Sequence, residues 1–452
     1  MNDTAAPTWR ERWLGRFGDA TREATLLSAG TQLEALFSFV TVVALTRTTS
    51  VTRAGEVFFA QALAAVVFLF LDPRLEDSLQ RYAALLTERG RDRAATTLFR
   101  RCFRLDTAIA IASGALVALV LAVAQPGGHG VFTLEYFSLA IVNALLQAPI
   151  GTAMAGFAIA GCLADLARLR IALAIVSSTA NVIAIVVGGP TAYLAANAIT
   201  TGLATVVIAV GAGRRVTRRF GRPAPIPAGS LPGIVNFTVK SSLATSVSFA
   251  SDQVLYAAAG AAGGAAFLAQ MRVATAPGRF VTSAASPVAS VLFPRTSTES
   301  ARGDQDAVRR LQERASVMLA PIAGVISAIS FVVMPFLVPL IYGSTYRTVV
   351  VETSIFVAAA SLRAVVIWSK VLLLAVGRPG LRLVELTIES LLMLGVTVWF
   401  AHAHDLLGVA IAQLGIAAVV VAWWLLIIRW QRLLFTPDTA PRAYSADDLR
   451  SA

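Results

Sequence analysis

The 452-residue chain is poor in charged side chains. Only 14% of its residues are Asp, Glu, Lys or Arg, whereas 56% are hydrophobic and the mean hydropathy is +0.71. An average soluble domain is about 25% charged. Because a helix satisfies its own backbone hydrogen bonds inside lipid, long apolar runs with so little charge predict an all-α, polytopic membrane protein.

Cysteine is scarce and nucleotide-binding motifs are missing. Cys102 and Cys162 are the only cysteines, too few for a disulfide framework or a structural zinc site. The sequence contains no P-loop, no GxGxxG and no Cys-x-x-Cys, so we expect no cofactor, no ATP-driven step and no enzymatic activity. Residues 1–24 are polar and carry no removable signal peptide, which makes the first apolar segment the expected insertion signal.

Apolar runs long enough to cross a hydrocarbon core of about 30 Å are the main feature of the sequence. We expect about twelve transmembrane helices. They fall at approximately 25–46, 55–73, 105–124, 134–161, 171–188, 191–212, 234–258, 264–293, 316–341, 350–376, 383–401 and 406–428.

The net charge of +12 is distributed as membrane topology requires. Thirty arginines lie in alternate polar segments, starting with residues 1–24, and only Arg47, Arg53 and Arg347 lie in the opposite loops. Positive residues accumulate on the cytoplasmic side of a membrane, so both termini are expected in the cytoplasm. Since topology accounts for most of the basic charge, nucleic acid is not an expected partner.

An Arg-, Pro- and Gly-rich stretch, "GAGRRVTRRFGRPAPIPAGSLPG", divides the spans into six plus six. The similarity between "FFAQALAA" (58–65) and "FLAQMRVA" (267–274) supports two six-helix bundles related by an internal repeat. The expected parts are a cytoplasmic N-terminal segment (1–24), an N-terminal bundle (25–212), a cytoplasmic linker (213–233), a C-terminal bundle (234–428) and a cytoplasmic tail (429–452).

Cations within the expected spans are candidate substrate ligands. Five such cations are present: Lys240, Arg272, Arg279, Arg363 and Lys370. Lys370 is not included among the candidate ligands, because it lies close enough to the cytoplasmic end of its span for its charge to reach the interface. An arginine at the centre of a membrane helix costs roughly 2.5–3.5 kcal/mol on insertion scales. Seven residues separate the two arginines of the eighth span, which puts them on one helix face. The intervening Pro277 and Gly278 predict a break in that helix, as expected for a helix lining water.

Carboxylates within spans are candidate ion-coupling groups. Glu34 and Asp252 each lie in the first span of a half. Two interpretations stay open for each of them, a proton or sodium site and a salt bridge that neutralises a cation. In the loop "HAHD" (402–405), His402, His404 and Asp405 could bind a metal, but a solvated connection is favoured and no metal site is expected.

Four segments carry a resemblance to a known family: "FLDPRLEDSLQRY" (70–82), "SFASDQVLYAAAG" (248–260), "IYGSTYR" (341–347) and "AVGRPGLRLVEL" (375–386). With the six-plus-six repeat, they resemble the polysaccharide exporter, or O-antigen flippase, family of the multidrug, oligosaccharidyl-lipid and polysaccharide exporter superfamily. The resemblance covers nearly the whole chain, through loose, hydrophobic motifs.

This resemblance implies that the chain flips an undecaprenyl-diphosphate-linked oligosaccharide across a bacterial inner membrane by alternating access around a cationic cavity. The residues that match by motif are Asp252, Arg272 and Arg279, and we add Lys240 and Arg363 as substrate ligands from their place in the spans. The implied partners are the lipid-linked substrate, the bilayer, a proton or sodium counter-ion, and other glycan-assembly proteins.

Three other functions remain open. A multidrug or cation exporter of the same superfamily would be expected to carry unpaired carboxylates in its second cavity. A membrane enzyme that polymerises or ligates lipid-linked sugars would be expected to have a sizeable periplasmic loop, and this sequence has none of that length. A scaffold for a glycan-assembly complex would tolerate substitution of its intramembrane arginines.

Overall fold

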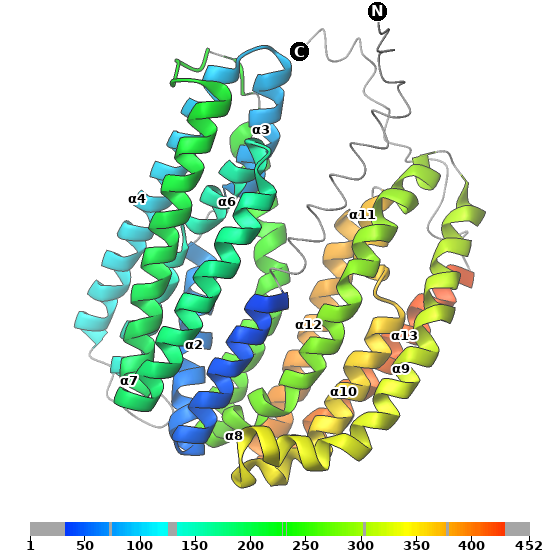
Figure 1. Cartoon of the computed structure of the whole chain (residues 1–452). Helices are drawn as coiled ribbons and strands as arrows, with labels where there is room; N and C mark the ends of the chain where they lie inside the picture. Colours follow the sequence, from blue (N-terminus) through cyan, green and yellow to red (C-terminus); the bar gives the residue numbers. More distant parts are fainter. Residues whose placement is uncertain are drawn as a thin grey trace, which may run out of the picture. The chain divides into compact units, whose positions relative to one another are not determined.

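The computed structural model describes residues 32–71, 75–124, 133–227, 229–231, 233–301, 304–376 and 379–429. Regular structure in these ranges is helical throughout (Figure 1), so the chain is an all-α, polytopic membrane protein as predicted. The helices are residues 32–48, α2 (Val51–Leu71), α3 (Glu76–Glu88), α4 (Asp92–Ala124), α5 (Leu134–Gln147), α6 (Ile150–Ile159), α7 (Leu163–Phe220), α8 (Ile234–Ala301), α9 (Gln305–Tyr342), a 3-10 turn η1 (Ser344–Val349), α10 (Val350–Val365), α11 (Ser369–Ala375), α12 (Pro379–His402) and α13 (Leu406–Arg429).

Nine helices in the described ranges are long and apolar enough to cross a membrane. Each of the twelve expected spans overlaps one of the observed helices, because α7 and α8 each contain two expected spans and residues 32–48 contain the described part of the first. The nine therefore do not include the first expected span, of which only residues 32–48 are described, and they count the two expected spans within α7 as one helix.

The connections inside α7 and α8 are single glycines. Gly189 (φ 70°, ψ −158°) and Gly264 (φ 81°, ψ 176°) have backbone angles that residues with a side chain rarely adopt. Each glycine interrupts an otherwise continuous helix. The chain thus passes from one expected span to the next with almost no loop.

Two expected spans are each divided into two helices. Residues 134–161 form α5 and α6, which meet at Pro149, where the ring removes a backbone donor. Residues 350–376 form α10 and α11, separated by a turn at 366–368 in which Val366 N donates to Arg363 O (3.2 Å). Trp368, in this turn, donates from Nε1 to Ser316 Oγ (2.8 Å) and so ties the turn to α9.

The chain forms two compact units, Met1–Ala257 and Ala258–Ala452. The first unit therefore includes the beginning of α8, which the sequence had assigned to the C-terminal bundle. Our division at residues 213–233 stays a prediction. Helix α7 continues as far as Phe220, so the first part of the expected linker is helical.

In the first unit, α3 completes a core with α4, α6 and α7. Helix α3 lies in the polar segment between the second and third expected spans. Leu79, Tyr82, Ala83 and Leu86 are buried, with the i, i+3, i+4, i+7 spacing of an amphipathic helix. Helix α3 was missed because it is too short and too polar to read as a span.

In the second unit, α9, α10 and α13 pack together. Trp368 and Trp424 lie edge to face at its centre, with ring centroids 5.7 Å apart. Both indoles are buried, and each donates a hydrogen bond from Nε1, to Ser316 and to Glu385 respectively. Satisfying the polar atom allows two large rings to lie in an apolar core.

Large apolar side chains also cover the outside of the helices. Val187 on α7 is 83% exposed, Phe336 on α9 is 75% exposed and Trp399 on α12 is 77% exposed. Soluble monomers rarely expose contiguous apolar surface of this kind. Such exposed apolar faces are expected for helices that contact lipid.

Candidate functional site

Helix α8 carries four of the candidate residues. Lys240 and Asp252 lie in its first part, and the positions of their side chains are outside the description. Arg272 and Arg279 lie beyond the Gly264 kink, in a part of α8 (253–286) that is a candidate membrane span by its length and composition. Both arginines also lie within the eighth expected span, 264–293.

The two arginines differ in exposure. Arg279 is exposed, whereas Arg272 is partly exposed with its Nε atom buried, and the neighbouring Met271 and Ala274 are fully buried. Seven residues correspond to about two turns of an α-helix, so the alignment predicted from spacing is present. The pair forms a cationic stripe along α8.

The predicted break at Pro277 and Gly278 is wrong. Helix α8 is continuous there, and the non-helical residue lies 13 positions earlier, at Gly264. Gly278 has a packing role instead. A Cβ at Gly278 would lie 3.2 Å from Phe356 O and 3.2 Å from Ala360 Cβ, so the missing side chain lets α8 approach α10 closely.

Arg363, the third candidate arginine, pairs with a carboxylate of its own unit. Its Nη2 lies 2.7 Å from Glu389 Oε1 and 3.6 Å from Met393 Sδ. The guanidinium is 30% exposed and the carboxylate 21% exposed, so the pair is mostly desolvated. Arg363 on α10 is therefore joined to α12.

A second ion pair lies one turn away on α12. Arg382 bonds Glu385, and Trp424 Nε1 donates to the other oxygen of Glu385 at 3.0 Å. Sequence analysis did not identify Arg382 or Trp424 as site residues. Trp424 lies 39 residues from Glu385, and no local sequence pattern relates residues that far apart. Glu385 and Glu389 each neutralise an arginine in the second unit.

Glu34, a candidate coupling carboxylate, forms a bidentate pair with Arg170 of α7. Arg170 Nε donates to Oε1 at 2.7 Å, and Nη2 contacts Oε2. The side chains are 29% and 22% exposed. Of the two interpretations left open by the sequence, this geometry matches the salt bridge, although a paired carboxylate can still exchange a proton when its partner moves away.

The loop containing His402, His404 and Asp405 is organised as a helix connection. Asp405 Oδ1 accepts from Gly408 N (2.8 Å), which caps the start of α13, and His404 adopts a positive φ of 52° in the turn. His402 Nδ1 lies 2.8 Å from Val398 O within its own helix. Within the described ranges, no group of His, Cys, Asp and Glu has the arrangement of a metal site.

No protein-family profile matches this sequence, and no curated protein is similar to it. Solved structures do share its fold. An inward-facing multidrug resistance MATE family transporter of the MOP superfamily superposes with a TM-score of 0.62 at 14% identity, covering 89% of this chain and 96% of that one.

Two further structures have the same fold. A mutant of a Vibrio cholerae MATE transporter superposes with a TM-score of 0.57 at 15% identity, covering 92% of this chain and 99% of that one. A MOP superfamily transporter from Pyrococcus furiosus superposes with a TM-score of 0.54 at 16% identity and covers 90% of this chain and 95% of that one. The latter is described as having a binding pocket of reversed polarity that suggests a different function.

Proposed function

We propose that this chain is an exporter of the bacterial inner membrane that flips an undecaprenyl-diphosphate-linked oligosaccharide from the cytoplasmic to the periplasmic side. Its two units would alternate between inward- and outward-open states, and both termini would lie in the cytoplasm. Other glycan-assembly proteins would supply the substrate and consume the product.

The observation that carries this proposal is the stripe formed by Arg272 and Arg279 on α8. Both residues lie in a candidate membrane-spanning part of α8, two helical turns apart, and both have side chains that are at least partly exposed. A diphosphate cannot cross hydrocarbon unaccompanied, and guanidinium groups offer planar, bidentate contacts to phosphate oxygens. At an effective dielectric constant near 20, one unit-charge contact at 4 Å contributes about 4 kcal/mol before desolvation.

Lys240 and Arg363 are proposed as additional ligands of the diphosphate. The 2.7 Å contact with Glu389 occupies Nη2 of Arg363. A guanidinium has five N–H donors, so Glu389 can also orient Arg363 while other donors contact a phosphate.

A proton or sodium ion is the proposed counter-ion, taken up at Glu34 or Asp252. In this mechanism protonation of Glu34 would release Arg170 and change the relative stability of the inward- and outward-open states. The structural basis is the bidentate contact between the two side chains, which exists only while Glu34 is ionised.

Export of cationic drugs is the second candidate function, because MATE transporters share this fold. Against it, the described carboxylates of α12, Glu385 and Glu389, are already paired with arginines. A cationic drug would have to displace a guanidinium to reach them. The pocket polarity described for the Pyrococcus furiosus protein is a precedent for other substrates on this fold.

Deleting the gene in its source bacterium tests these alternatives directly. Mass spectrometry of extracted lipids should reveal accumulated undecaprenyl-diphosphate oligosaccharide, and a plasmid copy of the gene should reverse the accumulation. Unchanged lipid-linked sugars together with greater sensitivity to cationic amphiphiles would instead favour drug export. Unchanged lipid-linked sugars and unchanged drug sensitivity would contradict both functions.

A further inference from the structure

A groove of about 650 Å³ lies in the first unit, between the beginning and the end of α7. Its lining divides into apolar and charged parts. The apolar part is Leu169, Val206, Val207 and Val210, and the charged part is Asp165, Arg168, Arg214 and Arg215, with Gly211 between them. None of these residues belongs to the proposed transport site.

The geometry points to a binding site for one anionic phospholipid of the surrounding bilayer, with its phosphate between the arginines and an acyl chain along the valines. We propose this site independently of what the protein transports. Three features support this site: the depth of the groove in the membrane, its positive charge, and the contacts that hold its arginines.

The groove crosses the expected boundary of the hydrocarbon core. Val206, Val207 and Val210 fall inside the predicted span 191–212, and Val206 and Val210 are 60% and 48% exposed. Arg168 precedes the span 171–188 by three residues, and Arg214 follows the span 191–212 by two. The apolar wall is thus at the depth of acyl chains and the arginines are at the depth of headgroup phosphates.

The charge of the groove is positive. Three arginines and one aspartate give a formal charge of +2 for the lining residues. Arg168 and Arg214 are exposed, and no ion pair of Arg214 is recorded with any residue in the described ranges. From the distribution of arginines along the chain, we expect both the beginning and the end of α7 on the cytoplasmic side of the membrane. The anionic lipids of the cytoplasmic leaflet attract basic side chains there.

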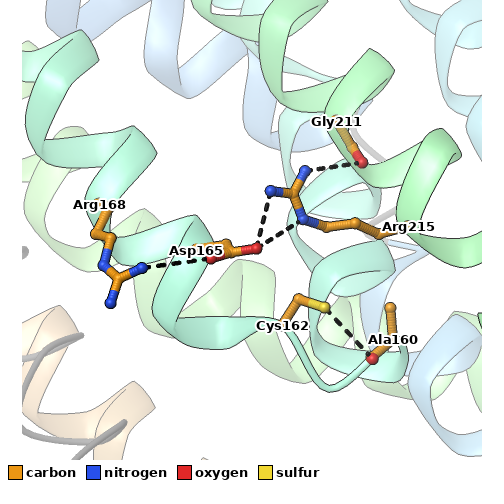
Figure 2. Close-up of polar contacts among 6 residues, drawn as sticks. All are labelled: Ala160, Cys162, Asp165, Arg168, Gly211 and Arg215. Atoms are coloured by element: carbon orange, nitrogen blue, oxygen red, sulfur yellow. Dashed lines mark hydrogen bonds and ion pairs between the residues drawn. The ribbon is translucent and has the colours of Figure 1, made fainter.

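Asp165 and Phe157 hold one guanidinium in place. Arg215 Nε and Nη2 lie 3.0 and 2.9 Å from Asp165 Oδ2, and the guanidinium carbon lies 4.8 Å from the centre of the Phe157 ring (Figure 2 shows the carboxylate contacts). Arg168 reaches the other oxygen of Asp165, with Nη1 to Oδ1 at 3.7 Å. The aspartate therefore holds Arg215 in place and neutralises one of the two charges, and its contact with the exposed Arg168 is longer.

Native mass spectrometry of the full-length protein in detergent would test this site, with phosphatidylglycerol and cardiolipin as anionic probes and phosphatidylcholine as the zwitterionic probe. The test variant is Arg168→Ala with Arg214→Ala, because these exposed side chains contribute little to folding. The matched control is Arg218→Ala with Arg219→Ala, which removes two exposed arginines of the same helix end that do not line the groove.

The wild-type protein should retain one phosphatidylglycerol or cardiolipin more tightly than phosphatidylcholine. The test variant should lose roughly 30-fold in affinity, since each arginine that contacts the phosphate contributes about fivefold, while the control, whose arginines do not line the groove, retains wild-type affinity. Lysine at 168 and 214 should restore most of the binding, and inorganic phosphate should not compete, because it lacks the acyl chain. Equal losses in the test and control variants would overturn the proposal, as would equal affinity for anionic and zwitterionic lipids.

Discussion

Arg272 and Arg279 are the residues on which the proposed function depends most. Replacing either by alanine should reduce glycan export about 10- to 100-fold, because a hydrogen bond to a charged group contributes about 1.5–3 kcal/mol. Lysine should rescue partly, since it keeps the charge but loses the bidentate fork. Surface glycan relative to immunoblotted protein is the measurement for each variant.

Arg314→Ala is the matched control for these arginine variants, because Arg314 is an exposed arginine of α9 outside the apolar part of that helix. It should leave export unchanged. Normal surface glycan in both alanine variants at 272 and 279 would mean that the stripe has a structural role, and the substrate ligands would have to lie elsewhere.

Glu34 and Arg170 allow a separate test at the residue scale. A double-mutant cycle with Glu34→Gln and Arg170→Met should give a coupling energy of about 1–3 kcal/mol, as expected for residues in one salt bridge. Thermal unfolding in detergent measures it. A coupling energy near zero would show that the bidentate contact contributes nothing to stability in the state that unfolds.

The coupling role of the same carboxylate needs a different readout. Glu34→Gln or Asp252→Asn should abolish the response of transport in proteoliposomes to an imposed proton or sodium gradient. If both variants respond as the wild type does, neither carboxylate couples transport to an ion, and the Glu34 pair is structural only.

At the scale of the helices, Gly189 and Gly264 interrupt α7 and α8. Gly189→Ala should destabilise the protein by about 1–3 kcal/mol, because its backbone angles lie in a region essentially restricted to glycine. No other atom lies within 4 Å of a Cβ added at Gly189, so any loss reflects the backbone and not a clash. The midpoint of thermal unfolding is the measurement.

Gly213, in the same helix, is the matched control for Gly189. A Cβ there also meets nothing within 4 Å, but no positive φ is recorded for this residue. Gly213→Ala should therefore stabilise the protein by about 0.5–1 kcal/mol, the usual gain when alanine replaces glycine inside a helix. Equal effects at both positions would contradict the kink interpretation.

At the scale of the whole molecule, the inside-outside orientation is testable with single cysteines. After removal of Cys102 and Cys162, cysteines at Arg222 and Arg310 should be protected from an impermeant thiol reagent in intact cells, whereas cysteines at Ser344 and His402 should be labelled. All four introduced sites are exposed, so burial does not limit labelling. The reverse pattern would invert the topology.

The sequence by itself determined the class of the molecule and its helical segments. A run of about twenty apolar residues can satisfy its backbone in lipid only as a helix, so composition and length suffice to find most spans. The seven-residue spacing of Arg272 and Arg279 likewise fixed their common face, because helical periodicity is a local property.

Only the tertiary structure decided which charges neutralise one another. Arg170 lies 136 residues from Glu34, and Glu389 lies 26 residues from Arg363 on a different helix. Such pairs depend on helix packing, which no local pattern encodes. The break predicted at Pro277 is absent, and the non-helical residue of α8 is Gly264, whose backbone angles glycine adopts most readily.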